Sequence, residues 1–172
     1  MKDFIGIISL FIFIALVGSV GKLDIEFTQS CEGYLKRAAD ANTVSIAKEE
    51  LGKALKYLKD NDLTHGSTHI LYKTPSSDLG FLYKNLTASY KVLDKASKNE
   101  SLSNLEESNI LIKLRESLLD RGSDGDHVSL PKFISLFPYQ DRFFIWFLFG
   151  LPGLLWLFLF TMPKKKVKHR KW

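Results

Sequence analysis

Histidine and acidic side chains that could do chemistry occur in two short stretches of the chain. His65 and His69 are four residues apart, the spacing that places two metal ligands on one face of a helix. Gly66, Ser67 and Thr68 lie between them, and these residue types disfavour helix. These intervening residues therefore predict that the two histidines lie in a loop and form no metal site.

The acidic stretch DRGSDGDH, residues 120–127, carries oxygen ligands of the kind that calcium prefers. An EF-hand loop needs a Glu at its twelfth position, and the twelfth residue counted from Asp120 is Pro131. This stretch is therefore predicted to be a solvated loop. The sequence has no P-loop, nucleophile elbow, paired zinc cysteines or dinucleotide fingerprint. We expect no catalytic residues, no cofactor and no metal, and therefore no enzyme.

Two apolar stretches are long enough to cross, or nearly cross, a bilayer. Phe4–Val20 would extend about 26 Å as a helix and Phe143–Met162 about 30 Å, against a hydrocarbon core of about 30 Å. The first stretch has two interpretations. It is either an uncleaved anchor or a secretory signal peptide, since Lys2 precedes it and the small residues Ser19–Gly21 follow it.

Aromatic and basic residues predict how the second stretch meets the bilayer. Aromatic side chains favour the bilayer interfaces, so Trp146 and Trp156 are expected to contact lipid. Basic residues beside a span stay in the cytoplasm, and each attracts anionic lipid by about 1 kcal/mol. The residues concerned are Lys164, Lys165, Lys166, Lys168, Arg170 and Lys171. We expect a cytoplasmic tail that contacts anionic headgroups.

This orientation predicts an integral protein of the plasma or inner membrane with an extracytoplasmic central region. Both termini are cytoplasmic if the first stretch is uncleaved, and the centre is exported in either case. Residues 22–142 hold seventeen Lys or Arg against eighteen Asp or Glu, so the net charge of +5 comes from the tail. A nucleic-acid binder would spread basic residues over a folded face, so we expect no nucleic-acid partner.

The central region has the periodicity of packed helices. Phe27, Cys31, Leu35 and Ala38 form one apolar seam, and a second seam consists of Val44, Ala47, Leu51, Ala54 and Leu58. No Pro or Gly separates the seams, which slightly favours one long helix over two. Cys31 is expected either as a core residue or as a thiol that crosslinks two copies.

Helix signals continue beyond an irregular stretch at residues 60–74. Thr74 and Pro75 are expected to start one helix, whose apolar face carries Leu79, Leu82, Leu86, Tyr90 and Leu93. Ser103 and Glu106 form a predicted capping box for a last helix, which Gly122 is expected to end. The residues of this helix expected to face inward are Leu111, Leu114 and Leu118. After it, Phe133, Phe137 and Tyr139 are expected at the headgroups or packed under the bundle.

The fold class is therefore predicted as all-α, an exported up-down bundle of three to four helices flanked by two transmembrane helices. The expected divisions are 1–21 as anchor or signal peptide, 22–122 as bundle, 123–142 as juxtamembrane loop, 143–162 as span and 163–172 as basic tail. The layout of residues 1–162 resembles the outer half of bacterial chemoreceptors and sensor kinases. Those proteins continue into a cytoplasmic signalling region, and no ligand residue is carried over from them.

Three functions remain open from the sequence. The first is a membrane-anchored interaction protein whose bundle contacts another membrane or envelope protein, or a second copy of itself. The second is a small-ligand sensor or accessory subunit of a signalling system, and the third is a membrane-active effector. The loop residues expected to meet a ligand or partner are His65, His69, Tyr72 and Asp78, because loops on a rigid frame often carry recognition.

Overall fold

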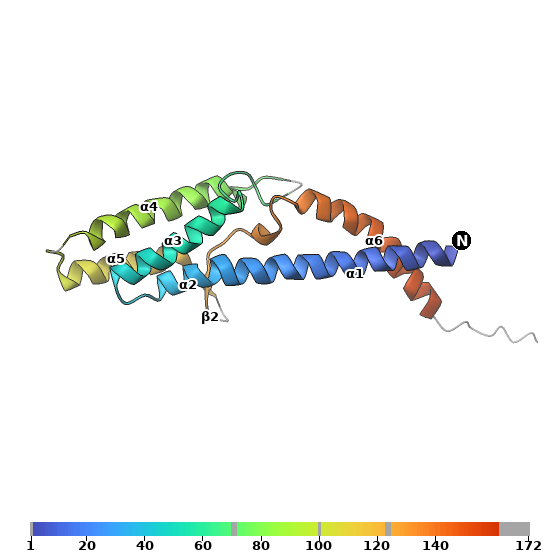
Figure 1. The fold of residues 1–172 in the computed structure, drawn as a ribbon, viewed down its shortest axis with the longest axis horizontal. Coiled ribbons are helices and arrows are strands. Elements are labelled where there is room, and N and C mark those ends of the chain that lie inside the picture. Colours follow the sequence, from blue (N-terminus) through green and yellow to red (C-terminus); the bar gives the residue numbers. More distant parts are fainter. Residues whose placement is uncertain (1, 70–71, 100, 123–124, 162–172) are drawn as a thin grey trace, which may run out of the picture. The chain divides into compact units, whose positions relative to one another are not determined.

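The computed structural model describes residues 2–69, 72–99, 101–122 and 125–161, with side chains left undescribed at 2–5, 121–122 and 156–161. The chain divides into two compact units. The first unit consists of residues 1–20 and 141–172, and the second consists of residues 21–140. Both units are mainly helical, which confirms the all-α fold class (Figure 1).

The chain begins with one continuous run of helix in three parts. Helix α1, Lys2–Phe27, passes into a π-helical turn, η1, Thr28–Glu32, and then into α2, Gly33–Ala39. The backbone stays in the right-handed helical region at both junctions. From Gly6 to Ala39 this helix is long and apolar enough to cross a membrane, and it is the one such helix among the described residues.

Helix α3, Val44–Asp60, is separate from α2, so the prediction of one long helix was wrong. Thr43 has an extended backbone with φ −137°, and its hydroxyl accepts a hydrogen bond from the Ile46 N–H. This is the geometry of a helix N-cap, and it satisfies an amide that has no partner inside the helix. The capping residue marks the break, although no Pro or Gly does.

Helices α4, Leu79–Ser97, and α5, Asn104–Leu118, complete the bundle. The capping box predicted for α5 is confirmed, with Ser103 and Glu106 each bonding to the other's backbone N–H. Thr74 and Pro75 were expected to start α4, but Thr74 caps a short 3-10 turn, η2, Pro75–Ser77. The N-cap of α4 is Asp78.

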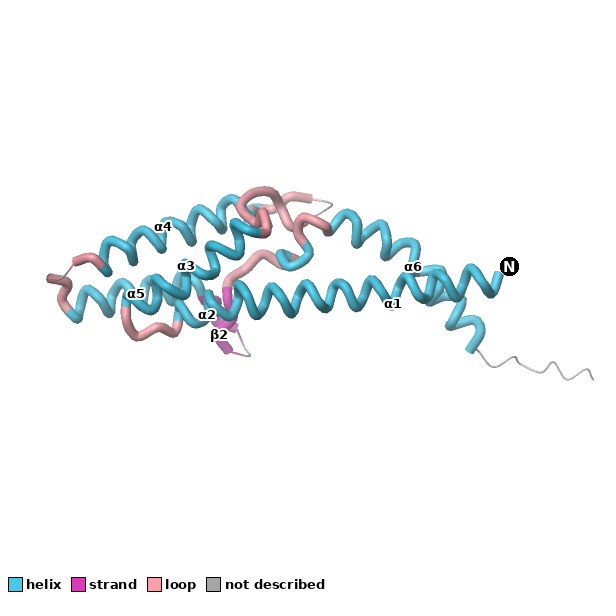
Figure 2. Tube along the Cα trace, viewed as in Figure 1, coloured by secondary structure: helices cyan, strands magenta, loops and turns pink. Residues whose placement is uncertain are grey.

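The stretch predicted as a solvated loop is an antiparallel β-hairpin (Figure 2). Strand β1, Leu119–Gly122, pairs with β2, Gly125–Val128. Helix α5 therefore ends at Leu118, and the prediction that Gly122 would end it was wrong. The dipeptide Asp124-Gly125 is a common hairpin sequence, and this signal was missed.

The core of the second unit is built from the two predicted seams. All nine seam residues are buried, which confirms both periodicities. Helix α3 packs against α2 and α4, and α5 packs against the other three helices (Figure 1). Of the residues predicted inward on α4 and α5, Leu79, Leu86, Leu93, Leu114 and Leu118 are buried. Leu82, Tyr90 and Leu111 are partly buried against this core.

The segment after β2 divides between the core and the surface. Ile134 is buried within a 3-10 turn, η3, Ile134–Leu136, and the Phe137 ring lies against Gly66, where an added Cβ would be 2.7 Å from it. Phe133 and Tyr139 are exposed. Of the three aromatic residues Phe133, Phe137 and Tyr139, only Phe137 thus packs against the core of the second unit.

Two hydrogen bonds tie this segment to other parts of the second unit. The Ser135 hydroxyl donates to Asp24 Oδ1 over 3.0 Å, and the Gln140 amide donates to the Ser67 carbonyl over 3.2 Å. Asp24 follows the first apolar stretch, and Gln140 precedes the second. The residues that flank the two apolar stretches are thus both anchored in the second unit.

The first unit contains the start of α1 and helix α6, Gln140–Thr161, in which Pro152 lies inside the helix. Trp146, one of the two predicted lipid contacts, is 52% exposed. The side chain of Trp156 lies outside the described residues, as do all six basic tail residues: Lys164, Lys165, Lys166, Lys168, Arg170 and Lys171. The second predicted span, which runs into this part of the chain, stays a prediction.

Candidate functional site

The four predicted loop residues do not form one site. The His69 and Tyr72 rings contact each other with their centroids 5.3 Å apart and their planes tilted by 39°. His65 lies elsewhere in the loop. Its Nδ1 is 3.7 Å from Asp62 Oδ1 and 3.3 Å from the Thr64 hydroxyl. No group of three or more His, Cys, Asp or Glu that could hold a metal ion occurs among the residues that the structure describes.

Hydroxyl groups, not histidines, organise this loop. The Ser77 hydroxyl accepts a hydrogen bond from the Thr74 N–H and lies 2.8 Å from the Ser67 hydroxyl. A bridge between Ser67 and Asp78 closes the loop. Asp78 Oδ1 accepts from two backbone amides at the start of α4, so this carboxylate is the N-cap of that helix. The loop is thus fixed by its own contacts, and Asp78 has a structural role.

A groove of about 570 Å³ lies next to this loop in the second unit. Its long wall is α4, where Phe81, Asn85 and Ser89 follow one another at one-turn spacing. The other lining residues come from α2, the end of α5, β1, and the segment that follows β2. The three α4 residues extend over about 12 Å of helix, because each residue rises 1.5 Å.

The groove combines exposed apolar surface with acidic groups. Phe81 is 61% exposed, and Leu82, Leu130 and Pro131 add further apolar surface. The charged residues among the described lining are two acids, Asp78 and Asp120, with no Lys or Arg beside them. Hydroxyl groups come from Ser76, Ser89, Ser117 and Ser129. The lining therefore matches an occupant that has both an apolar face and a positive charge.

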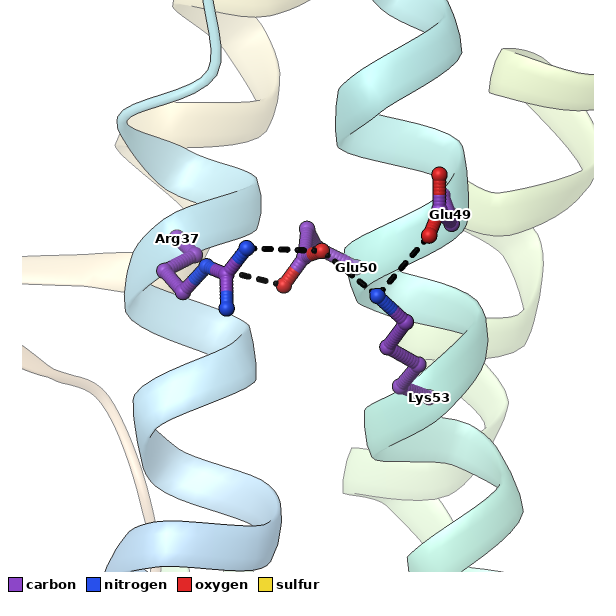
Figure 3. Close-up of polar contacts among 4 residues, drawn as sticks. All are labelled: Arg37, Glu49, Glu50 and Lys53. Carbon is purple, nitrogen blue, oxygen red and sulfur yellow. Dashed lines mark hydrogen bonds and ion pairs between the residues drawn. The ribbon is translucent and has the colours of Figure 1, made fainter.

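A second cluster of polar residues lies between α2 and α3 (Figure 3). Glu50 is 3% exposed and accepts hydrogen bonds from Arg37 Nη2 at 3.1 Å and Lys53 Nζ at 2.8 Å. Arg37 Nε makes a further ion pair at 3.0 Å with the second carboxylate oxygen. Both cations lie within 6 Å of the Tyr34 ring centroid, at 5.8 and 5.6 Å.

This cluster connects two helices through the Glu50 carboxylate, whose Oε1 accepts both hydrogen bonds while Oε2 has, among the described residues, only the ion pair with Arg37. Lys53 also pairs with Glu49 at 2.8 Å, and the hydrogen bonds that Lys53 donates to Glu49 and Glu50 raise the pKa of the lysine. The same contact lowers the pKa of Glu49. Because Arg37 and Lys53 cover the buried carboxylate of Glu50, we interpret the cluster as a clamp between α2 and α3.

Cys31 is fully buried in the core of the second unit. Burial raises the pKa of its thiol to about 12, and the nearby charge of Glu32 adds to the shift. Thiolate is the reactive form, so a thiol in this state is inert at neutral pH. Of the two expectations for Cys31, the structure favours the core residue over the crosslinking thiol.

Comparison with known proteins gives no relative for this chain. No protein-family model matches it, and neither the curated proteins nor the solved structures contain a significant match. The groove is the feature that sequence reasoning missed. Its walls come from residues 35 to 131, and α4 was assigned only by its apolar face, so no local pattern pointed to it.

Proposed function

We propose that this protein is a membrane-anchored interaction protein whose exported helical bundle contacts another membrane or envelope protein. In this proposal α1 and α6 both cross the bilayer, and the basic tail keeps the C-terminus in the cytoplasm. The central helices stand off the membrane as an up-down bundle. Support for the placement comes from the long apolar helix between Gly6 and Ala39 and from the distribution of charge along the sequence.

The groove beside α4 is the proposed contact surface. A site for a small molecule buries most of its ligand, whereas Phe81 in this groove is already 61% exposed to solvent. A polypeptide fits such an open surface better, because main-chain and side-chain contacts can extend along the 12 Å of α4, a length equal to about four extended residues. The observation that carries the proposal is this exposed apolar wall together with Asp120, an exposed acid in the lining of the groove.

The occupant that matches this lining is a segment with apolar side chains and at least one Lys or Arg. Opposite charges across an interface raise the association rate and discriminate between partners. Asp120 is exposed, and it forms no ion pair with any Lys or Arg in the part of the chain that the structure describes. A cation on the partner therefore has an acceptor at the edge of the groove.

The test uses the full chain in lipid nanodiscs and an unbiased library of displayed peptides. We expect selected peptides to combine basic and apolar residues, and to lose binding when Phe81→Asp or Asp120→Lys is introduced. Leu105→Asp is the matched control, because Leu105 is 72% exposed on α5 and outside the groove lining. Peptides that bind all three variants equally, or peptides without basic residues, would contradict the proposed surface.

The membrane placement is tested separately. We expect the full chain to stay with vesicles in alkaline carbonate, and a reporter enzyme fused after Leu105 to be active only outside the cytoplasm. Release of the chain by carbonate, or a reporter active in the cytoplasm, would contradict the placement while leaving the groove experiment interpretable.

A further inference from the structure

Ser9 is a buried polar residue in an apolar helix of the first unit. It lies in α1 among Ile, Leu and Phe residues, and it is 6% exposed. Its hydroxyl donates a hydrogen bond to the Phe149 carbonyl over 2.7 Å, and the Gly153 N–H donates to the same hydroxyl over 2.9 Å. The same hydroxyl also lies 3.4 Å from the Gly150 carbonyl, but its two shorter hydrogen bonds are to two backbone groups of α6, the Phe149 carbonyl and the Gly153 N–H.

These two backbone groups belong together in the helical hydrogen-bond pattern. In a regular α-helix the N–H of Gly153 donates to the carbonyl four residues earlier, which is that of Phe149. The Ser9 hydroxyl connects the same pair from the outside, next to Pro152, the residue that disturbs the helix. Side chains that enter the backbone ladder are a known cause of helix kinks.

Two glycines of α6 make this approach possible. A Cβ at Gly153 would lie 2.5 Å from the Leu10 nitrogen and 2.7 Å from the Ser9 carbonyl carbon, so any side chain there would strike the backbone of α1. A Cβ at Gly150 would lie 3.1 Å from the Phe13 Cβ. By contrast, Gly18 and Gly21 in α1 have nothing within 4 Å of such a Cβ. The contact is therefore specific to one crossing point.

The environment of the crossing makes its hydrogen bonds important. The side chains around it that face outward are apolar, with Phe11, Ile14, Ile145 and Phe149 all more than half exposed. In a bilayer no water reaches such a surface, and a backbone group left without a partner there costs several kcal/mol. Small residues at close crossings and serine hydrogen bonds are the contacts by which membrane helices associate.

We propose that the first apolar helix is retained as the permanent intramembrane partner of α6, with the Ser9 hydroxyl bridging the Phe149 carbonyl and the Gly153 N–H of α6 beside Pro152. The sequence left open whether this segment is an anchor or a cleaved signal peptide. Cleavage would remove Ser9 and Phe13 and expose the backbone at Gly150 and Gly153 to lipid. The inference rests on the membrane placement proposed above, and it does not depend on the groove.

The test is a disulfide between the two helices in the full chain, expressed in membranes. Phe13→Cys and Gly150→Cys place two thiols at the crossing, where a Cβ added at Gly150 would lie 3.1 Å from the Phe13 Cβ. A shift of a few tenths of an ångström brings the two positions to the separation of about 3.5–4.5 Å found in disulfides. Cys31→Ala removes the native thiol. A protease site inserted after Asn99, in the exposed turn between α4 and α5, allows the chain to be cut.

We expect the two halves of the cut chain to stay together after oxidation and to separate on reduction. Phe11→Cys with Gly150→Cys is the matched control, because Phe11 is 69% exposed and faces away from the crossing. The control pair should give little crosslink. A disulfide that joins two chains, or halves that separate without reductant while the protein stays in the membrane, would overturn the inference and leave the membrane placement intact.

A second set of variants tests the hydrogen bonds themselves. Ser9→Ala should lower the ratio of crosslinked to free protein by about threefold, the typical effect of one hydrogen bond between membrane helices. Ser19→Ala is the control in the same helix, because the Ser19 hydroxyl bonds only to the Ala15 carbonyl of α1. Gly153→Leu should abolish the crosslink, and Gly18→Leu should leave it unchanged. Equal crosslinking with and without Ser9→Ala in the same double-cysteine protein would show that the hydroxyl has no such role.

Discussion

The two units of this protein place their polar and apolar groups in opposite ways. In the second unit the fully buried residues are mainly apolar, such as Leu35, Leu51 and Leu79, and the ion pairs lie at or near the surface. In the first unit the exposed large side chains of the described residues are mainly apolar, and a buried contact is a serine hydroxyl that bonds to backbone groups of α6. The same chain thus folds by two different rules.

The difference agrees with the proposed placement, in which the first unit lies in lipid and the second in water. Water drives apolar side chains of the second unit together, because each buried Leu gains about 1.5–3 kcal/mol over an exposed one. Lipid gives no such gain, so helices in it associate through close backbone approach and hydrogen bonds. The clamp at Glu50 combines features of both units, because a polar group is buried in the second unit. Its carboxylate is paired with two cations, Arg37 and Lys53, near the surface.

The largest difference between the units is expected for truncation of an apolar side chain. Leu51→Ala should lower the free energy of unfolding by about 2–5 kcal/mol, because the residue is fully buried and leaves a cavity. Phe11→Ala, which removes a larger but 69% exposed side chain of the first unit, should change it far less. Urea unfolding of the full chain in detergent, followed by circular dichroism, measures both. Equal losses would show that the first unit is also held by burial of apolar side chains.

The clamp at Glu50 tests whether a buried charge in the second unit needs its partners. Replacing Arg37 and Lys53 by Met should cost about 1–3 kcal/mol, because the carboxylate then loses the donors that compensate its burial. Adding Glu50→Leu should restore most of the loss, since an apolar residue needs no donor at that position. The same denaturation experiment gives the three values. If the variant with all three changes is as unstable as the variant with Arg37 and Lys53 replaced, the loss of stability comes from packing of the two long side chains and not from the buried charge.

Removal of a helix cap is expected to have a smaller effect in the second unit. Ser103→Ala should lower stability by about 1 kcal/mol, the usual cost of losing an N-cap side chain. Ser108→Ala is a control within the same helix, because the Ser108 hydroxyl bonds to a carbonyl of α5, that of Asn104. Thermal unfolding of the two variants should show a lower midpoint for Ser103→Ala alone. A shift in both would point to a general effect of serine in this helix.

The smallest effect is expected from pH, through exposed carboxylates of the second unit. Hydrogen bonds from Ser103 lower the pKa of Glu106 from its ordinary value of 4.5, and those from Lys98 and Lys48 lower the pKa of Asp94 from 3.8. A carboxyl group with a lowered folded pKa stabilises the folded state fully above its ordinary value. That stability is lost as the pH falls through the folded pKa.

Unfolding experiments between pH 7 and pH 2 should therefore show a plateau at neutral pH and a decline below about 4.5. Replacing Lys48 and Lys98 by Met should reduce the part of the decline that belongs to Asp94. An unchanged profile in that variant would show that these surface pairs do not contribute to stability.

Much of the second unit could be predicted from the sequence because its signals are local. The seams of α1 to α3 repeat every three or four residues, and the capping box of α5 spans only residues 103–106. The break between α2 and α3 was misjudged because Thr43 alone marks it. The hairpin at residues 119–128 was missed because acidic residues suggested a loop, although Asp-Gly is a turn sequence.

The predicted functional loop shows the limit of this reasoning. His65, His69, Tyr72 and Asp78 were grouped because they are close in sequence, yet Asp78 is occupied as a helix cap and His65 lies apart from the His69 and Tyr72 pair. Proximity along an irregular segment does not determine which side chains meet, because the turns between them set the direction of each one.

By itself the sequence determined the helical class, the apolar seams and the caps, since these depend on residues within one or two helical turns of each other. Only the tertiary structure decided where the groove lies and which backbone groups Ser9 contacts. Ser9 and Phe149 are 140 positions apart along the chain, and the groove combines residues 35 to 131. Contacts of this kind arise from how whole helices pack, which no local periodicity encodes.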